Sequence, residues 1–283
     1  MQQHSKASMN HPNNDASTPL LPSEAGAMTS NKEGEMPSWP IPSHWTNAST
    51  ISDEGVVLYG FKVSPPCCKV RAILKHYGVK FTEVVTMKKE TGDYKKTPVL
   101  TIGEKQINDS FIIIQVLAQV LENAPMSERE KAIEEMTTTG LMLALEVSVM
   151  ESTTAMQQCA PHMSDNICLQ GMIFMFACCV PCCGLSSRIK SKFPELKSLS
   201  AYGHLYAKEL GSNPFFHGEQ FGVIDCARFG CLEPFAAAGN QGFNDFINTD
   251  ERYGIHFSIC LLLILSPSHS VISPSSIRLL TCF

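Results

Sequence analysis

The sequence lacks the features that would direct it to a nucleic acid, to secretion or across a membrane. Lysine and arginine number 22 against 27 acidic residues, a net charge of −5, whereas nucleic-acid binding usually needs a basic surface. The first twenty residues are polar and contain no apolar segment of a secretory signal, and no arginine precedes Arg71 as it would in a transit peptide. The sequence therefore predicts an intracellular protein, either cytoplasmic or peripheral on an organelle membrane.

The twelve cysteines lack the spacing of a disulfide framework, because six of them form adjacent pairs: Cys67-Cys68, Cys178-Cys179 and Cys182-Cys183. Neighbouring cysteines rarely bridge each other, so we interpret them as free thiols in a reducing compartment. Vicinal pairs are also poor tetrahedral ligands, and we predict no metal site.

No apolar run is long enough to span a bilayer, which needs about 20 residues. The longest candidate, residues 172–185, is short and is interrupted by Pro181. Besides a metal site, which the vicinal cysteines disfavour, two interpretations stay open: a buried helix, or a peripheral membrane contact in which cysteines accept palmitate beside Arg188, Lys190 and Lys192.

Composition divides the chain into four parts. Residues 1–54 are rich in Ser, Pro, Asn and Met without apolar periodicity, which predicts a disordered tail. Trp39 and Trp45 are exceptions that could dock onto the body. Residues 55–122 form an α/β domain and residues 123–253 a helical one, whereas residues 254–283 are apolar and then Ser- and Pro-rich, which predicts an irregular tail.

The α/β part follows the order of a thioredoxin-like domain. A continuous apolar run over 56–61 predicts a buried strand, and Ser64-Pro65-Pro66 is typical of a helix start. That helix shows an apolar face up to Tyr77 and ends at Gly78, before a second strand over 81–85. A strand resuming after Pro98, a short partner over 106–107 and an apolar helix over 110–121 complete the domain.

The remaining stretches are helical. Ser127 and Glu130 have the spacing of a capping box that opens a helix over 128–151, and further helices are predicted over 200–210 and 224–238. Asp225 is expected to accept backbone N–H bonds at the start of the last of these, a structural role.

Three sites in the α/β part carry candidate chemistry. Ser64 stands where a buried strand meets a helix N-terminus, so its hydroxyl could donate to the thiolate of a bound thiol or could simply cap the helix. If the bond between Thr97 and Pro98 is cis, the Thr97 backbone is turned outward to pair with a peptide-like ligand. We expect Ser110 to cap its helix while Asp109 stays free to hold an α-ammonium group.

The segment from Leu58 to Leu121 resembles the glutaredoxin-like domain of the prostaglandin E synthase type 2 family, within the wider glutathione-transferase superfamily. The resemblance rests on these residues: Leu58-Tyr59, Phe61-Lys62, Cys67, Lys69-Val70-Arg71-Ala72, Pro98-Val99-Leu100 and Ile107-Asn108-Asp109-Ser110, followed by Ile112-Ile113. It continues more weakly through residues 187–191 and 216–230. It implies a thioredoxin-like domain followed by an all-α glutathione-transferase domain.

The resemblance also implies a ligand and a reaction. Glutathione would be bound by Thr97, Pro98, Asp109 and Ser110 with help from Lys96, and haem is a second cofactor that the family suggests. The substrate would be an apolar electrophile or lipid peroxide, with a prostaglandin endoperoxide as the named candidate, and the chain could form a homodimer.

The sequence departs from the family at the motif C-P-F-C, where Ser64 replaces the first cysteine and Cys67 matches only the second. A serine here is similar to zeta and theta glutathione transferases, whose hydroxyl supports the glutathione thiolate. We therefore name Ser64 and Cys67 as candidate catalytic residues. A glutathione-dependent isomerase or transferase is the leading hypothesis, and a non-catalytic scaffold and a thiol oxidoreductase acting through Cys67 are the alternatives.

Overall fold

The computed structural model describes residues 29–30, 34–86, 94–163, 170–171, 175, 184–237, 239, 241–251, 254, 256, 258 and 260. The strands are β1 (Thr29–Ser30), β2 (Val56–Gly60), β3 (Phe81–Val85), β4 (Val99–Ile102) and β5 (Lys105–Asn108). The helices of the first half are α1 (Ala48–Asp53), α2 (Pro65–His76) and α3 (Ser110–Leu121). Those of the second half are α4 (Glu128–Met136), the π-helical turn η1 (Thr137–Leu141), α5 (Met142–Met150), α6 (Thr153–Met163), α8 (Leu185–Lys192), α9 (Leu199–Leu210), α10 (Val223–Ala237) and α11 (Gln241–Ile247).

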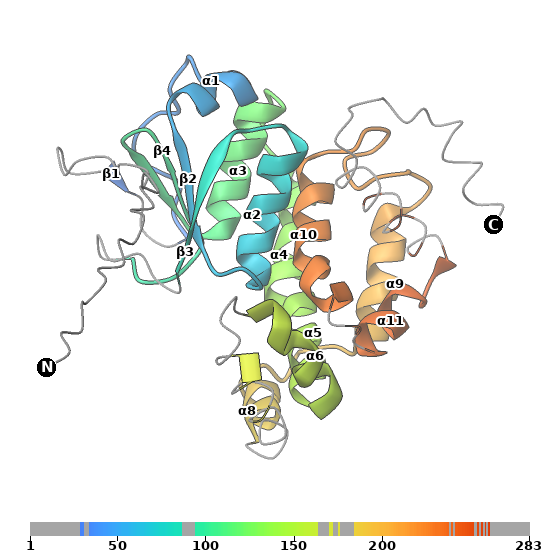
Figure 1. Cartoon of the computed structure of the whole chain (residues 1–283). Coiled ribbons are helices and arrows are strands. Elements are labelled where there is room, and N and C mark those ends of the chain that lie inside the picture. The colour runs from blue at the N-terminus through green and yellow to red at the C-terminus, as the bar shows by residue number, and fades with distance from the viewer. Residues whose placement is uncertain are drawn as a thin grey trace, which may run out of the picture.

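The strands form one mixed sheet in the order β1-β5-β4-β2-β3. β2 and β3 run parallel, whereas β4 is antiparallel to both β2 and β5. Helices α2 and α3 lie between this sheet and the helical half, as Figure 1 shows. The predicted fold class, an α/β thioredoxin-like domain followed by an all-α domain, is confirmed.

Local sequence explains why α2 starts and ends where it does. Ser64 is the N-cap and prolines occupy the first two helical positions, where a missing N–H costs nothing. Val70 and Ile73 of its apolar face are fully buried, in the same core as Leu58 of β2 and Leu100 of β4. Gly78 follows the helix with a φ of +69°, a left-handed conformation that glycine adopts without a Cβ penalty.

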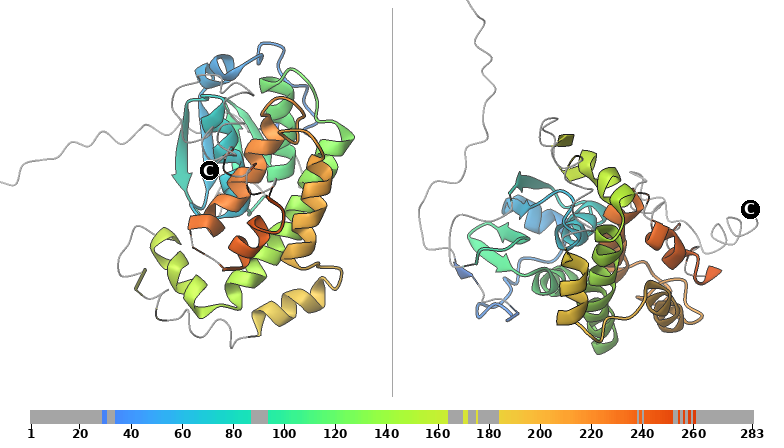
Figure 2. Two further views of the ribbon diagram at one scale, coloured as in Figure 1. Left: turned by 90° about the vertical axis from the view of Figure 1, so that its right-hand side faces the viewer. Right: turned by 90° about the horizontal axis from the view of Figure 1, so that it is seen from below.

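The helix predicted over 128–151 is present but interrupted. The Thr137 hydroxyl donates to the Ile133 carbonyl at 2.8 Å and lies 2.7 Å from the Tyr206 hydroxyl. Gly140 sits under Tyr202, where a Cβ would come within 2.4 Å of the phenol oxygen. These tertiary contacts accompany the π-helical turn η1, and Figure 2 shows α4 and α5 (green) still following one another along one line. The predicted helices over 200–210 and 224–238 appear as α9 and α10.

Two terminal expectations need correction. Residues 34–54 are not a disordered tail, because Asn47 forms a capping box with Thr50 at the start of α1 and the α1 residue Ile51 is fully buried. Trp45, at 5% exposure, belongs to the main core. Residues 254–283 are not irregular throughout, since the described positions among 254–260 are helical and His256 is buried. Residues 1–28 and 261–283 lie outside the described residues.

Helix α10 packs along α2 and joins the two halves (Figures 1 and 2). At their crossing a Cβ on Gly230 would lie 2.4 Å from the Cys68 carbonyl oxygen, so only glycine permits this approach. Beside it, Lys69 of α2 forms an ion pair with Glu134 of α4, and both side chains have 0% exposure. The halves therefore share one continuous core.

Most of the 172–185 segment, for which a buried helix or a membrane contact is predicted, lies outside the described residues, including the cysteines from 178 to 183. Within the part that is described, none of the helices combines the length and the apolar character needed to cross a bilayer.

Candidate functional site

The three segments that carry the candidate chemistry meet at one edge of the sheet. Tyr59, near the end of β2, is paired with Val99 at the start of β4, and Val99 is paired with Asn108 at the end of β5. Ser64 follows β2, Thr97-Pro98 precedes β4 and Asp109-Ser110 follows β5. The register therefore brings all three segments to this edge, which we call the cleft edge. Ligands of open α/β sheets usually bind at such an edge.

Ser64 is the N-cap of α2, but its side chain makes no capping hydrogen bond. Its amide donates to the Phe61 carbonyl at 3.1 Å, and its carbonyl accepts from the Cys68 amide at 2.9 Å. The side chain is half-buried. The reading of Ser64 as a plain side-chain cap is therefore wrong, and its hydroxyl is not committed to its own helix.

The N-terminus of α2 offers few other donors. Pro65 and Pro66 have no N–H, and the Cys68 amide is bonded to the Ser64 carbonyl. The amide of Cys67 and the Ser64 hydroxyl are therefore the groups of this turn that can face an anion, in addition to the helix dipole.

The peptide bond between Thr97 and Pro98 is cis, which meets the condition set from the sequence. Thr97 is half-buried and Pro98 is buried, whereas the adjacent Lys96 is exposed. Thr97 and Lys96 are thus the more exposed residues of this segment of the cleft edge.

Asp109, and not Ser110, caps α3. The Asp109 carboxylate accepts from the Phe111 amide at 2.8 Å, while Ser110 is the first helical residue and is 6% exposed. The expectation of a free Asp109 is wrong, because aspartate and serine both cap helices well and the sequence does not distinguish them. The Asp109 backbone also has a φ of +71°. Such a φ is uncommon for a residue with a Cβ, and residues in uncommon conformations cluster at functional sites.

The two cysteines after Ser64 are both buried. Cys67 has 0% exposure, and its sulfur would lie 3.0 Å from a Cβ on Gly60. Cys68 is 2% exposed, and burial, the largest influence, raises the pKa of its thiol to about 12 despite the nearby Arg71. A protonated, buried thiol is a poor nucleophile. The structure therefore places Ser64 at the cleft edge but does not place the Cys67 sulfur where a substrate could reach it.

Sequence reasoning missed a group of side chains behind Ser64. Arg71 of α2 donates from Nη1 to the Lys62 carbonyl at 3.0 Å and to the Cys68 sulfur at 3.2 Å. Its Nε lies 3.1 Å from both carboxylate oxygens of Glu83 on β3, and its Nη2 also contacts Glu83. The only signal in the sequence was an arginine and a glutamate at positions that a parallel strand–helix–strand unit brings together.

Asp225 has the structural role predicted for it. Its fully buried carboxylate accepts from the amides of Phe216 at 2.8 Å and Gly222 at 3.2 Å. His256 lies 3.1 Å from the same carboxylate, and burial lowers the pKa of this histidine despite that contact. Across the described part of the chain, no cluster of three His, Cys, Asp or Glu side chains is arranged to hold a metal ion.

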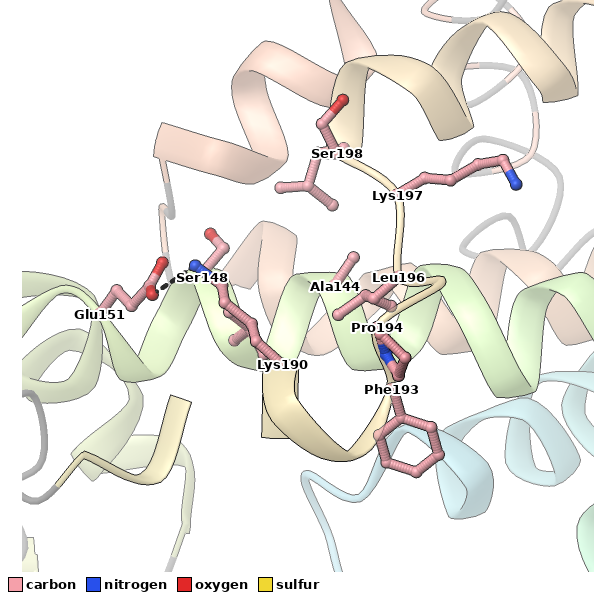
Figure 3. Close-up of a pocket in the computed structure, with 11 residues that line it drawn as sticks. Ala144, Ser148, Glu151, Lys190, Phe193, Pro194, Leu196, Lys197 and Ser198 are labelled. Atoms are coloured by element: carbon pink, nitrogen blue, oxygen red, sulfur yellow. Dashed lines mark hydrogen bonds and ion pairs between the residues drawn. The ribbon is translucent and has the colours of Figure 1, made fainter. Parts of the chain in front are cut away.

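A cavity of about 460 Å³ lies in the helical half and is not part of the cleft edge. It is bounded by α5, by Lys190 of α8 and by the segment from Phe193 to Leu199. Figure 3 shows the Lys190 ammonium meeting Glu151 on its wall, at 2.6 Å. Its walls contain none of the site residues predicted from the sequence.

Comparisons with known proteins agree with this topology. Residues 58–125 match the family model described as glutathione S-transferase, N-terminal domain. No curated protein matches the chain.

Several solved structures resemble the chain in outline. A glutathione S-transferase of Ceriporiopsis subvermispora in complex with glutathione shares 14% identity, with a TM-score of 0.48 over 76% of this chain and 99% of that one. A Tau class glutathione S-transferase from mango, Mangifera indica, shares 18% identity, with a TM-score of 0.40 over 80% and 95%. A beta-etherase from Sphingobium shares 12%, with a TM-score of 0.41 over 72% and 99%. The sheet topology and the family match over residues 58–125 together indicate an N-terminal domain like that of the glutathione S-transferases.

Proposed function

We propose that the protein binds glutathione at the cleft edge and uses it against an apolar electrophile. The observation that carries this proposal is the meeting of Ser64, Thr97-Pro98 and Asp109-Ser110 at one sheet edge, beside the N-terminus of α2. The match of residues 58–125 to a glutathione S-transferase domain supports the same ligand.

The residues at this edge fit the groups of a γ-glutamyl tripeptide. One oxygen of the Asp109 carboxylate accepts from the Phe111 amide, so the second oxygen can accept from an α-ammonium group. The first amides of α3 suit an α-carboxylate. The backbone of Thr97 can pair with the cysteinyl backbone, and exposed Lys96 adds positive charge beside it.

Ser64 is proposed to stabilise the thiolate of bound glutathione. When glutathione is bound, it supplies a thiol whose anion is the nucleophile. The Ser64 hydroxyl makes no capping hydrogen bond in α2 and donates instead to that sulfur, while the dipole of α2 favours the negative charge on the sulfur. Together they lower the pKa of the bound thiol and leave it ionised at neutral pH.

The electrophile is proposed to be apolar, and a prostaglandin endoperoxide is the specific candidate suggested by the family resemblance. In an isomerisation the thiolate would form an S–O bond with one peroxide oxygen as the O–O bond breaks, and the other oxygen would take up a proton. Loss of the proton from the carbon that carries the S–O oxygen would then form a carbonyl group, break the S–O bond and release the thiolate. In a conjugation by substitution the sulfur would instead keep its new bond to carbon while the electrophile's leaving group departs. Both outcomes use the same ionised thiol, so one site serves either reaction.

The test measures glutathione binding, the pKa of the bound thiol and the conjugation of a chlorodinitrobenzene in wild type and Ser64→Ala. We expect binding in both, a thiol pKa below that of free glutathione only in wild type, and a kcat/KM lower on the order of 10²-fold in the variant, the effect of losing one donor to a developing charge. The matched control is Ser198→Ala, which removes a serine that does cap its helix, α9, away from the cleft edge.

The outcomes separate the alternatives. Binding without turnover, unchanged in Ser64→Ala, would indicate a scaffold that kept only the fold. Activity lost in Cys67→Ser and kept in Ser64→Ala would indicate a thiol oxidoreductase, although the full burial of Cys67 argues against it. A bound thiol with the pKa of free glutathione would contradict the proposal.

A further inference from the structure

The loop between β2 and α2 is held by side chains at a single carbonyl. The Lys62 carbonyl accepts from Arg71 Nη1 at 3.0 Å and from the Cys68 thiol at 3.2 Å, so both of its lone pairs have a donor. Two residues after Lys62, the Ser64 amide donates a hydrogen bond to the Phe61 carbonyl at 3.1 Å. The backbone that carries Ser64 is thus fixed from both ends of a tight turn.

Arg71 is itself held in place from a second element. Glu83 of β3 receives its Nε and Nη2 in a forked contact, and these side chains are only 12% and 25% exposed. Glu83 lies opposite Leu58 of β2 in the parallel pair. The guanidinium therefore ties β3, α2 and the loop together, which a flexible ammonium could not do with the same geometry.

Cys68 contributes only while it keeps its proton. A thiolate has no hydrogen to donate, and the Lys62 carbonyl cannot donate to it. Burial raises the pKa of Cys68 to about 12, so the thiol stays protonated at neutral pH and the second contact persists. Arg71 Nη1 at the same time donates to the Cys68 sulfur at 3.2 Å, which aligns the thiol toward the carbonyl.

We propose that Arg71 and Cys68 are positioning residues that set the Ser64 hydroxyl through the Lys62 carbonyl. The inference rests on the proposed function of Ser64 as the donor to a bound thiol. The Ser64 side chain makes no bond within its helix cap. The loop backbone sets the direction of the Ser64 Cα–Cβ bond, and so it determines the positions that the hydroxyl can reach in its staggered rotamers. Loss of the two donors would leave the hydroxyl present but misdirected.

The first experiment follows hydrogen exchange of the Ser64 amide in the full chain without ligand. Arg71→Lys and Cys68→Ala should each speed this exchange about tenfold, the effect of one lost hydrogen bond to or from a charged or buried group, and Cys68→Ser should restore the slow rate because its hydroxyl can donate. The control is Arg129→Gln, which removes an equivalent bond to the Phe216 carbonyl, 2.8 Å long, in the helical half. Unchanged exchange in both Arg71→Lys and Cys68→Ala overturns the inference, whether or not glutathione binds.

The second experiment separates positioning from a general structural effect. The pKa of the glutathione thiol is measured in complexes of wild type, Arg71→Lys, Ser64→Ala and the double variant. Arg71→Lys keeps the positive charge, so we expect it to raise the thiol pKa in the wild-type background and to change nothing once Ser64 is gone. An equal effect in both backgrounds would overturn the inference, because the change would then not pass through the hydroxyl.

The two failures can be told apart. If the wild-type chain does not retain glutathione, the proposed function fails, while the exchange rates still decide whether Arg71 and Cys68 fix the loop. If glutathione binds and its thiol pKa depends on Ser64 but not on Arg71, only the positioning role fails. Because Cys68→Ala removes a single sulfur, it provides a folded comparison if Arg71→Lys is unstable.

Discussion

The ion pair between Lys69 and Glu134 crosses from the α/β domain to the helical domain with both side chains at 0% exposure. The Lys69 ammonium also donates to the Thr138 hydroxyl at 2.7 Å, and that hydroxyl donates to Glu134 at 3.0 Å. One oxygen of Glu134, Oε2, has no hydrogen-bond partner. Glu134→Gln keeps the shape of this side chain but leaves the lysine charge without its counter-charge.

The expected cost follows from that burial. Removing one partner of a desolvated ion pair usually costs about 3–5 kcal/mol, whereas replacing both by apolar side chains is often neutral or stabilising. With a urea dependence of about 3 kcal/mol per molar, the upper range for small proteins, the midpoint of Glu134→Gln should fall by about 1–2 M. The double variant Lys69→Met with Glu134→Leu should recover most of this loss.

Urea unfolding followed by circular dichroism measures both quantities. The matched control is Glu128→Gln, which breaks the exposed pair with Lys131 in the same helix, where Glu128 is 90% exposed. Pairs of this kind contribute less than about 1 kcal/mol. If Glu134→Gln falls within the range of that control, or the double variant is as unstable as the single one, the pair is not desolvated and the reasoning from burial is refuted.

Three further perturbations have defined outcomes. Burial alone would lower the pKa of His217, but the 2.6 Å contact with Glu130 and the negative charges of Glu122, Glu130 and Asp225 together outweigh burial and raise this pKa. The resulting stabilisation is fully present below about pH 6.5 and is lost as the pH rises through the higher folded value. His217→Gln should therefore lower the urea midpoint more at mildly acidic than at alkaline pH, and an equal loss at both would contradict the assignment. Gly230→Ala brings a Cβ within 2.4 Å of the Cys68 carbonyl oxygen and should destabilise the chain by about 1–3 kcal/mol or more, seen as a lower melting temperature; an unchanged temperature would mean that α2 and α10 can separate there. Asp225→Ala leaves buried loop amides without an acceptor, at about 1–3 kcal/mol each, whereas Asp225→Asn should retain part of the stability in the same melting experiment.

The α/β domain could be predicted almost element by element because its signals are local. A continuous apolar run, a serine followed by two prolines and a closing glycine specify β2, α2 and the turn after it without reference to the rest of the chain. The predicted α3 coincides with the observed one, and only its cap was assigned to the wrong neighbour, since Asp109 and Ser110 have similar capping preferences.

The remaining features depend on partners far away in the sequence. Trp45 and Ile51 are buried in a core that composition does not reveal, so a segment rich in Ser and Pro is predicted to be disordered although these two residues anchor it. A lysine in a helix is expected to face solvent, and the burial of Lys69 follows only from its contact with Glu134, 65 positions later. The link from Glu83 through Arg71 to Lys62 likewise exists only once β3 lies beside β2.

Helix α2 both begins at the cleft edge and packs against α10, so a change in α10 can reach the cleft edge through it. Its first turn presents Ser64, while its flank is pressed against α10 so closely that Gly230 admits no side chain. A substitution on α10 that tilts α2 would therefore also displace the Ser64 oxygen, one helix away from the altered surface. Changes in the helical domain can thus move the hydroxyl on which the proposed function depends, without a single change among the residues of the cleft edge.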